Sequence, residues 1–214
     1  MLEVSALGTR AYAAAIQGHM AVARDILDRA RSVIGELGGG FWLPPVYAAV
    51  YALWEGQAAA AERELRPGFE ALSRIGEKSH FSSLAVMLAQ TVYEQGRYDE
   101  AEAIAAEASD AARPIDVQCQ TISRTVRAKV LARRGEAERA EELAREAIGF
   151  VESSDFLPAH SEALMDLAEV LRLLGRPREA GAALDEAVRL HELKGNVVSA
   201  ARARRLSEVL AGKG

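Results

Sequence analysis

Hydrophobic residues recur at helical spacing along most of the chain, and the pattern is clearest between residues 164 and 188. On each side of Gly175 they lie three or four positions apart, which places them on one face of an α-helix. These residues are Leu164, Leu167, Leu171 and Leu174 before the glycine, and Leu184 and Val188 after it. The segment is therefore predicted to form two amphipathic helices joined by a tight turn at Gly175.

The same unit recurs along the chain at intervals of 38 to 40 residues. Each copy has a glycine at the predicted turn and small residues seven positions before it, five after it and twelve after it. The turn glycines are Gly18, Gly56, Gly96, Gly135 and Gly175. The three columns of small residues read Ala11, Ala49, Ala89, Ala128 and Ala168; Ala23, Ala61, Ala101, Ala140 and Ala180; and Ala30, Gly68, Ala108, Ala147 and Ala187. The regular interval predicts five helical hairpins of one kind.

The small residues mark the positions where helices must approach each other closely. Helices pack at about 8 to 10 Å between their axes, and the lower end of that range leaves room only for Ala or Gly at the crossing. A larger side chain there overpacks the contact, at a cost of about 1 to 3 kcal/mol. We therefore expect these columns to be buried between helices.

The chain is predicted to be a single all-α domain over residues 1–214. Its hairpins are expected at about 2–35, 44–76, 79–112, 116–152 and 158–193, followed by a capping helix at 196–210. The capping helix has no partner, and its mixture of Ala and Arg suits one side that covers the open end of a stack and another that faces water. Pro67 lies inside the second return helix, where we expect a kink near Arg66.

Composition and charge restrict the class of function and the cellular location that we expect. Half of the 214 residues are hydrophobic and only 6% are aromatic, which fits a folded, helical protein. The formal net charge is -5, which argues against nucleic acid as a ligand because cations supply most of the affinity for phosphates. No apolar stretch approaches the roughly 18 to 20 residues of a membrane span. Cys119 is the only cysteine, which fits a reducing compartment, and a cytoplasmic location is expected.

The columns around Gly135 and Gly175 resemble the tetratricopeptide repeat (TPR), which has a small residue in its first helix and Ala twice in its second. The resemblance covers essentially the whole chain, with a period longer than the usual 34 or so residues. Residues 163–206 look most like the C-terminal helical ends of large bacterial ATP-binding transcriptional regulators and of ATPase-linked nucleotide cyclases. The resemblance implies a right-handed α-α superhelix, a TPR-like solenoid, whose first helices line a concave groove.

The resemblance also implies that residues thirteen, ten, six, three and two positions before each turn glycine face the groove. The expected partner-binding residues are Tyr12, Leu43, Val46, Val50, Leu53, Trp54, Gln90, Tyr93, Lys129, Arg133, Glu169 and Arg172. Further residues at these positions are Ile16, Val86, Ile122, Thr125, Glu162 and Met165. We expect a groove that is apolar at its N-terminal end and charged at the other, with Lys129, Arg133 and Arg172 available to carboxylates. In the alternative, aromatic residues such as Trp54 and Tyr93 fill the core or face a second copy of the chain.

The sequence has no pattern typical of catalysis or of metal or cofactor binding. The four His are far apart, no Gly-Lys-Ser/Thr phosphate motif occurs, and Cys119 is expected to be a small buried residue. The basic cluster from Arg124 to Arg134 is followed at once by glutamates, so we expect it to be a solvated face. The chain is therefore predicted not to be an enzyme and to use no cofactor.

The sequence favours a protein-binding or regulatory module that presents its groove to a peptide, a helix or a partner domain, as part of or related to a bacterial signalling or transcriptional regulator. A homodimer is one form of this partnership. Direct contacts with nucleic acid or with a membrane are not expected. The alternative is a sensing domain whose groove holds a small apolar molecule.

Overall fold

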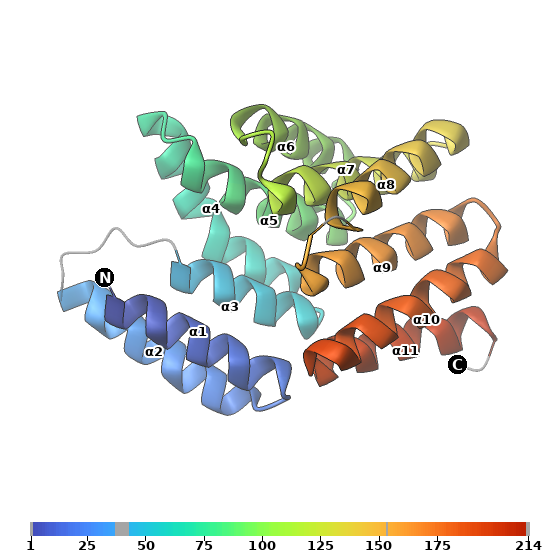
Figure 1. Ribbon diagram of the computed structural model, residues 1–214. Coiled ribbons are helices and arrows are strands. Elements are labelled where there is room, and N and C mark those ends of the chain that lie inside the picture. Colours follow the sequence, from blue (N-terminus) through green and yellow to red (C-terminus); the bar gives the residue numbers. More distant parts are fainter. Residues whose placement is uncertain (1, 37–42, 153, 213–214) are drawn as a thin grey trace.

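The computed structural model describes residues 2–36, 43–152 and 154–212, and these form eleven α-helices and no strand (Figure 1). The helices are α1 (Leu2–Ile16), α2 (Met20–Glu36), α3 (Leu43–Trp54), α4 (Ala58–Ile75), α5 (Ser79–Glu94), α6 (Tyr98–Ala111), α7 (Val117–Arg133), α8 (Ala137–Glu152), α9 (Leu157–Leu173), α10 (Pro177–Lys194) and α11 (Val197–Leu210). The first ten pair as consecutive hairpins, and α11 follows them. The predicted all-α solenoid of five hairpins and a C-terminal helix is confirmed.

Each of the five hairpins turns at its predicted glycine. The five glycines have φ between 74° and 84°, in the left-handed region that glycine adopts without strain. At Gly175 the backbone amide donates to the carbonyl of Arg172 (3.0 Å), and the amide of Arg176 donates to the carbonyl of Leu171 (2.9 Å). This pair of hydrogen bonds is the Schellman arrangement that ends a helix at a glycine.

The columns of small residues lie where the helices meet. All fourteen alanines of these columns are between 0% and 3% exposed. At the one glycine among them, Gly68, an added Cβ would lie 2.8 Å from Cδ1 of Leu84, which is itself fully buried. The prediction that these positions are close helix contacts is confirmed.

Ion pairs join each hairpin to the next at a repeated position. The residue six positions after a turn glycine pairs with a residue next to the following turn glycine. The four pairs are Arg24 with Glu55, Arg97 with Glu62, Arg134 with Glu102, and Arg176 with Glu141. These side chains are partly exposed, so a single pair contributes little. Because the contact recurs at all four junctions, it favours one register between neighbouring hairpins.

Helix α4 continues through Pro67 to Ile75. The proline therefore does not end the helix, although its nitrogen has no hydrogen to donate to the carbonyl of Arg63. The kink expected near Arg66 stays a prediction. Within the described residues, no helix combines the length and apolar character needed to cross a bilayer.

Helix α11 closes the array on itself. One side of it packs on α10, where Ala200 and Ala203 are buried, and another side contacts α1 and α3 at the start of the chain (Figure 1). Val197 lies beside the first turn, since a Cβ added to Gly18 would be 3.9 Å from its Cγ2. As expected, α11 covers the last hairpin and keeps an exposed side that includes Arg204, Arg205 and Glu208. It was not expected to contact α1 and α3 as well, and this contact brings the two ends of the superhelix together.

Candidate functional site

The closed array surrounds a cavity of about 900 Å³. Its walls come mainly from the first helices of the hairpins, α1, α3, α5, α7 and α9, together with α11. Nine of the twelve expected groove residues line it, namely Tyr12, Val46, Val50, Leu53, Trp54, Gln90, Lys129, Glu169 and Arg172. Tyr93 and Arg133 are not part of the lining, and the side chain of Leu43 lies outside the described residues. That any of them contacts a partner stays a prediction.

The further residues at these positions also include some that line the cavity and some that do not. Four of them line the cavity, namely Ile122, Thr125, Glu162 and Met165. Val86 is buried in the core between helices, at 1% exposure, and Ile16 is not part of the lining. The rule of positions before the turn glycine therefore selects mostly cavity residues.

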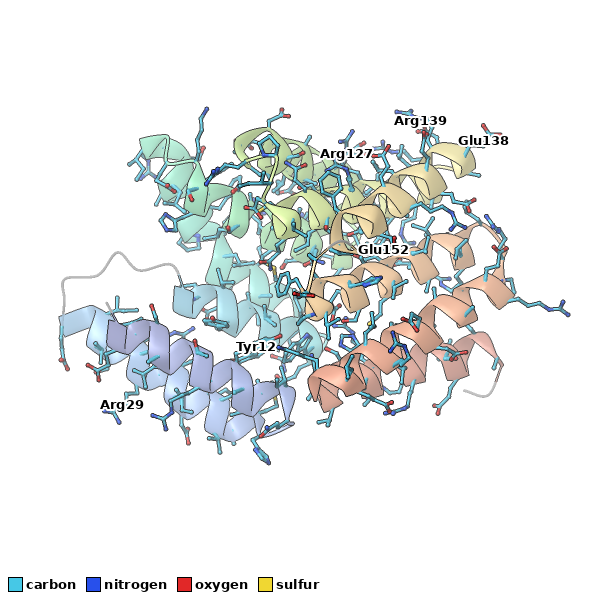
Figure 2. The ribbon with its side chains drawn as sticks, viewed as in Figure 1. Tyr12, Arg29, Arg127, Glu138, Arg139 and Glu152 are labelled. Carbon is cyan, nitrogen blue, oxygen red and sulfur yellow. The ribbon has the colours of Figure 1, made fainter. Side chains whose placement is uncertain are left out.

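One wall of the cavity is apolar and aromatic. The ring centroids of Tyr12 and Tyr47 are 6.2 Å apart, as are those of Tyr12 and Trp54. In Figure 2, Tyr12 lies where the N-terminal hairpins meet the last helices. Leu206 and Val209 of α11 also line the cavity and remain 44% and 64% exposed. Trp54 thus packs against other aromatic rings and still presents part of its surface to the cavity.

The charged part of the wall rests on a buried network. Lys129 is 2% exposed, and its Nζ lies 2.7 Å from Asp166 Oδ1 and 3.9 Å from Glu169 Oε2. The same Nζ lies 4.4 Å from the ring centroid of Tyr93. Arg133 donates to the Tyr93 hydroxyl (2.6 Å) and to Glu169 (2.8 Å). Burial alone would lower the pKa of Lys129, but the carboxylates of Asp166 and Glu169 raise it above its ordinary value.

Two of the three cationic side chains that were expected to bind carboxylates of a partner are therefore already paired within the array. Lys129 and Arg133 are neutralised by acidic residues of the same array. Arg172 is exposed, and its side chain makes no ion pair or hydrogen bond within the described part of the chain. Lys129 also departs from the expected solvated face, because α7 lies between other helices and most of its residues are buried.

Glu94 lines the cavity and is exposed within it. Its carboxylate has no ion pair or hydrogen bond among residues 2–36, 43–152 and 154–212. The surrounding protein displaces bulk water and raises the pKa of Glu94, and the neighbouring carboxylates of Glu169 and Asp166 add to the rise. Lys129 and Arg202 offset only part of it. The lining therefore includes an unpaired carboxylate in surroundings that disfavour its negative charge.

A second polar cluster consists of Glu162, which lines the cavity, and of Ser161 and His191, which are buried behind it. Ser161 and His191 are 0% and 1% exposed, and Ser161 Oγ lies 3.1 Å from His191 Nδ1. Glu162 Oε1 lies 3.7 Å from Nε2 of the same ring and also pairs with Arg202. The order serine, histidine, glutamate is that of a catalytic nucleophile, its base and an acid. The serine hydroxyl, however, is enclosed and donates to the carbonyl of Leu157 at 2.9 Å. The cluster joins α9, α10 and α11.

Several lining residues were not expected, although the repeat register contains a signal for some. Tyr47, Met87 and Asp166 each lie nine positions before a turn glycine. Glu94 lies two positions before Gly96, like Trp54 in the preceding hairpin. The lining residues of α11 have no such signal, because this helix follows the last repeat and reaches the cavity only through closure of the array. They are Arg202, Leu206, Val209 and Leu210.

Comparisons with known proteins agree with this geometry. Residues 83–113, which span most of α5 and all of α6, match a tetratricopeptide-repeat family model. The structure is similar to the crystal structure of a thermophilic TPR protein from Thermus thermophilus, with a TM-score of 0.62 and 17% sequence identity, over 96% of this chain and 95% of that chain. No curated protein matches the chain. The chain therefore has a TPR-like fold, and residues 83–113 match the repeat itself.

Proposed function

We propose that this chain is a protein-interaction module that holds a segment of a partner protein in its central cavity. TPR-like folds generally mediate contacts between proteins. The observation that supports the proposal is the cavity of about 900 Å³, in which an apolar wall accompanies a polar one. Such a cavity suits a segment with one apolar and one polar side.

The aromatic wall supplies the anchor contacts of this proposal. Aromatic side chains that enclose an apolar group in a central pocket contribute most to the affinity of many interfaces. Tyr12 and Trp54 contact each other and line the cavity. We infer that the apolar side of the segment packs there, next to the exposed Leu206 and Val209 of α11.

Selection from a displayed library of random peptides tests the proposal. Ala159→Trp places a bulky ring in the cavity, because Ala159 lines it and is only partly buried. Ala137→Trp is the matched control, since Ala137 is exposed at the start of α8, beside Glu138 on the outer end of that helix (Figure 2). Selected peptides should bind the wild type and Ala137→Trp equally, and Ala159→Trp at least about tenfold more weakly. Failure to enrich any peptide, or equal binding to Ala159→Trp, would contradict the proposal.

The closure by α11 favours a second candidate, a sensing domain for a small apolar molecule. A volume of about 900 Å³ falls within the usual size of small-molecule sites, about 300 to 1,000 Å³. In this case a metabolite screen should find a compound that raises the melting temperature of the wild type but not of Ala159→Trp. If no compound stabilises the wild type, the partner segment remains the proposed occupant of the cavity.

We also propose a setting for the module. The resemblance of residues 163–206 to the ends of large bacterial regulators supports a role within, or beside, a signalling or transcriptional regulator. The single cysteine supports a cytoplasmic location. A second copy of the chain is one candidate partner, and light scattering after size exclusion would show a mass of twice 23.0 kDa in that case.

A further inference from the structure

The charges that line or support the cavity mostly cancel in pairs. Lys129 pairs with Asp166, and Arg133 pairs with Glu169. On the neighbouring part of the wall, Glu162 pairs with Arg202. These groups leave no net charge to attract a ligand.

Glu94 is the negative group left over. Its carboxylate is unpaired within the part of the chain that the structure describes, and it lines the cavity. Arg172 and Lys194 are unpaired positive groups of the lining, but both are exposed and neither pairs with Glu94. A positive group brought to Glu94 by a ligand would relieve the repulsion from Asp166 and Glu169.

An apolar surface lies on the same level of the array as Glu94. Trp54 and Glu94 each lie two positions before a turn glycine, in successive hairpins whose first helices, α3 and α5, are in contact. Met87 and Gln90 follow the same face of α5 and also line the cavity. A ligand whose cation pairs with Glu94 therefore has Trp54 and the apolar side chains of the same cavity available, where its attached chain can pack.

We propose that the occupant of the cavity carries a positive ammonium or guanidinium group, which pairs with Glu94, and an apolar part that packs on Trp54 and the apolar wall. The inference rests on the proposed function, in which this group is a Lys or Arg side chain of the partner segment. A small amphiphilic amine has the same chemistry, and the experiments below distinguish these two sources.

Three probes of equal chain length and different charge test the inference: n-decylammonium, n-decanol and n-decanoate. Their binding is followed by the fluorescence of Trp54 at neutral pH, in a Trp42→Phe background that leaves a single tryptophan. Decylammonium should bind about tenfold more tightly than decanol, and decanoate most weakly. Glu94→Gln should abolish the preference for decylammonium over decanol.

Two control variants separate charge from apolar packing. Glu138→Gln removes an exposed carboxylate outside the cavity and should leave the preference unchanged. Val209→Gln removes apolar surface from the lining at a 64% exposed position, so it should weaken all three probes alike without disturbing the core. Decanoate bound as tightly as decylammonium, a preference that survives in Glu94→Gln, or binding of none of the probes would overturn the inference.

Peptide selection against the wild type and Glu94→Gln identifies the source of the positive group. Enrichment of Lys or Arg next to apolar residues in the wild-type selection, and its loss with Glu94→Gln, would support a partner segment. Peptides enriched without this preference would leave the proposed function standing and overturn the inference. Decylammonium bound at Glu94 with no peptide enriched would support a small amine and contradict the proposed partner segment.

Discussion

Ala128 and Ala168 show how much of the fold depends on single side chains. Both belong to the column seven positions before the turn glycine, and they are 0% and 3% exposed. We predict that Ala128→Leu and Ala168→Leu each destabilise the protein by about 1 to 3 kcal/mol, because a larger side chain separates the helices. This corresponds to about 2 to 4 °C in melting temperature per kcal/mol. Ala182→Leu, at an exposed position of α10, is the control, and unchanged melting of both test variants would refute the assignment of this column.

Lys129 is a buried charge whose partners depend on it. We predict that Lys129→Met lowers the free energy of unfolding by about 3 kcal/mol or more, because Asp166 and Glu169 lose the cation that compensates them. Urea unfolding at neutral pH measures the change. The double variant Lys129→Met, Asp166→Asn should recover part of the loss, since it removes one uncompensated carboxylate. A single variant as stable as the wild type would contradict the role assigned to this network.

His191 links stability to pH. Burial lowers its pKa below the ordinary value of 6.5, with Arg202 adding to the effect and Glu162 opposing it. The unfolded chain therefore takes up a proton before the folded one, so stability is retained above about pH 6.5 and is lost as the pH falls towards the folded-state pKa. We predict that His191→Gln reduces this loss in urea unfolding measured over a pH series. His19→Gln, at an exposed site, should follow the wild type.

At the scale of residues, repetition decides what is predictable from the sequence. The turn glycines and the small residues recur five times, so their burial follows from their spacing. The partner of Lys129 does not follow in the same way, because Asp166 lies in the next hairpin and only the superhelical register brings it within 2.7 Å. Two of the three cations assigned to a partner's carboxylate are therefore already paired inside the array.

Helix α4 is the element in which local preference and fold disagree. Pro67 lies in its interior, where a proline removes one hydrogen bond and costs up to about 3 kcal/mol. We predict that Pro67→Ala raises the free energy of unfolding by about 1 to 3 kcal/mol, since the new amide can donate to the carbonyl of Arg63. Pro177 occupies the first turn of α10, where proline is tolerated, so Pro177→Ala should bring no gain. Equal stability of Pro67→Ala and the wild type would show that the helix has fully adapted to the proline.

The helices themselves follow from the sequence because period, turn and contact residues agree in each hairpin. The ion pairs between hairpins also have a sequence signal, namely a charged residue six positions after one turn glycine and an opposite charge beside the next. This signal is visible once the repeat is aligned, even though the signs are reversed at the first junction, where Arg24 meets Glu55. The kink expected near Arg66 has no such repeated signal, since Pro67 occurs in one hairpin only.

At the scale of the whole molecule, closure of the array determines the shape of the cavity. It is not predictable from the repeat pattern, because it depends on the small rotation between successive hairpins, summed over all of them. Thirteen of the residues that the first-helix rule named belong to the lining, but the rule assigned none of the residues of α11. The expected groove is therefore a cavity that α11 closes in part and that stays open to solvent at exposed lining residues such as Leu206 and Val209.

The closure rests partly on Tyr12, which contacts Tyr47 and Trp54 and lies close enough to Glu162 for that carboxylate to raise its pKa, after burial, which has the larger effect. We predict that Tyr12→Asp opens the junction, because it removes the ring contacts and sets a carboxylate towards Glu162. The radius of gyration from small-angle X-ray scattering should increase relative to the wild type. Ala13→Asp, at the adjacent exposed position, should leave it unchanged, and an equal radius for both variants would argue against this role.

Contact between α11 and the first hairpins also affects how the molecule responds to force and to an occupant. An open solenoid behaves as a spring, because small changes in angle between neighbours add up to a large change in its length. When the ends touch, a change at one junction must be compensated at the others. We therefore expect the array to be stiffer than an open solenoid. It should select a ligand by its width, because it does not stretch to accommodate a wider one.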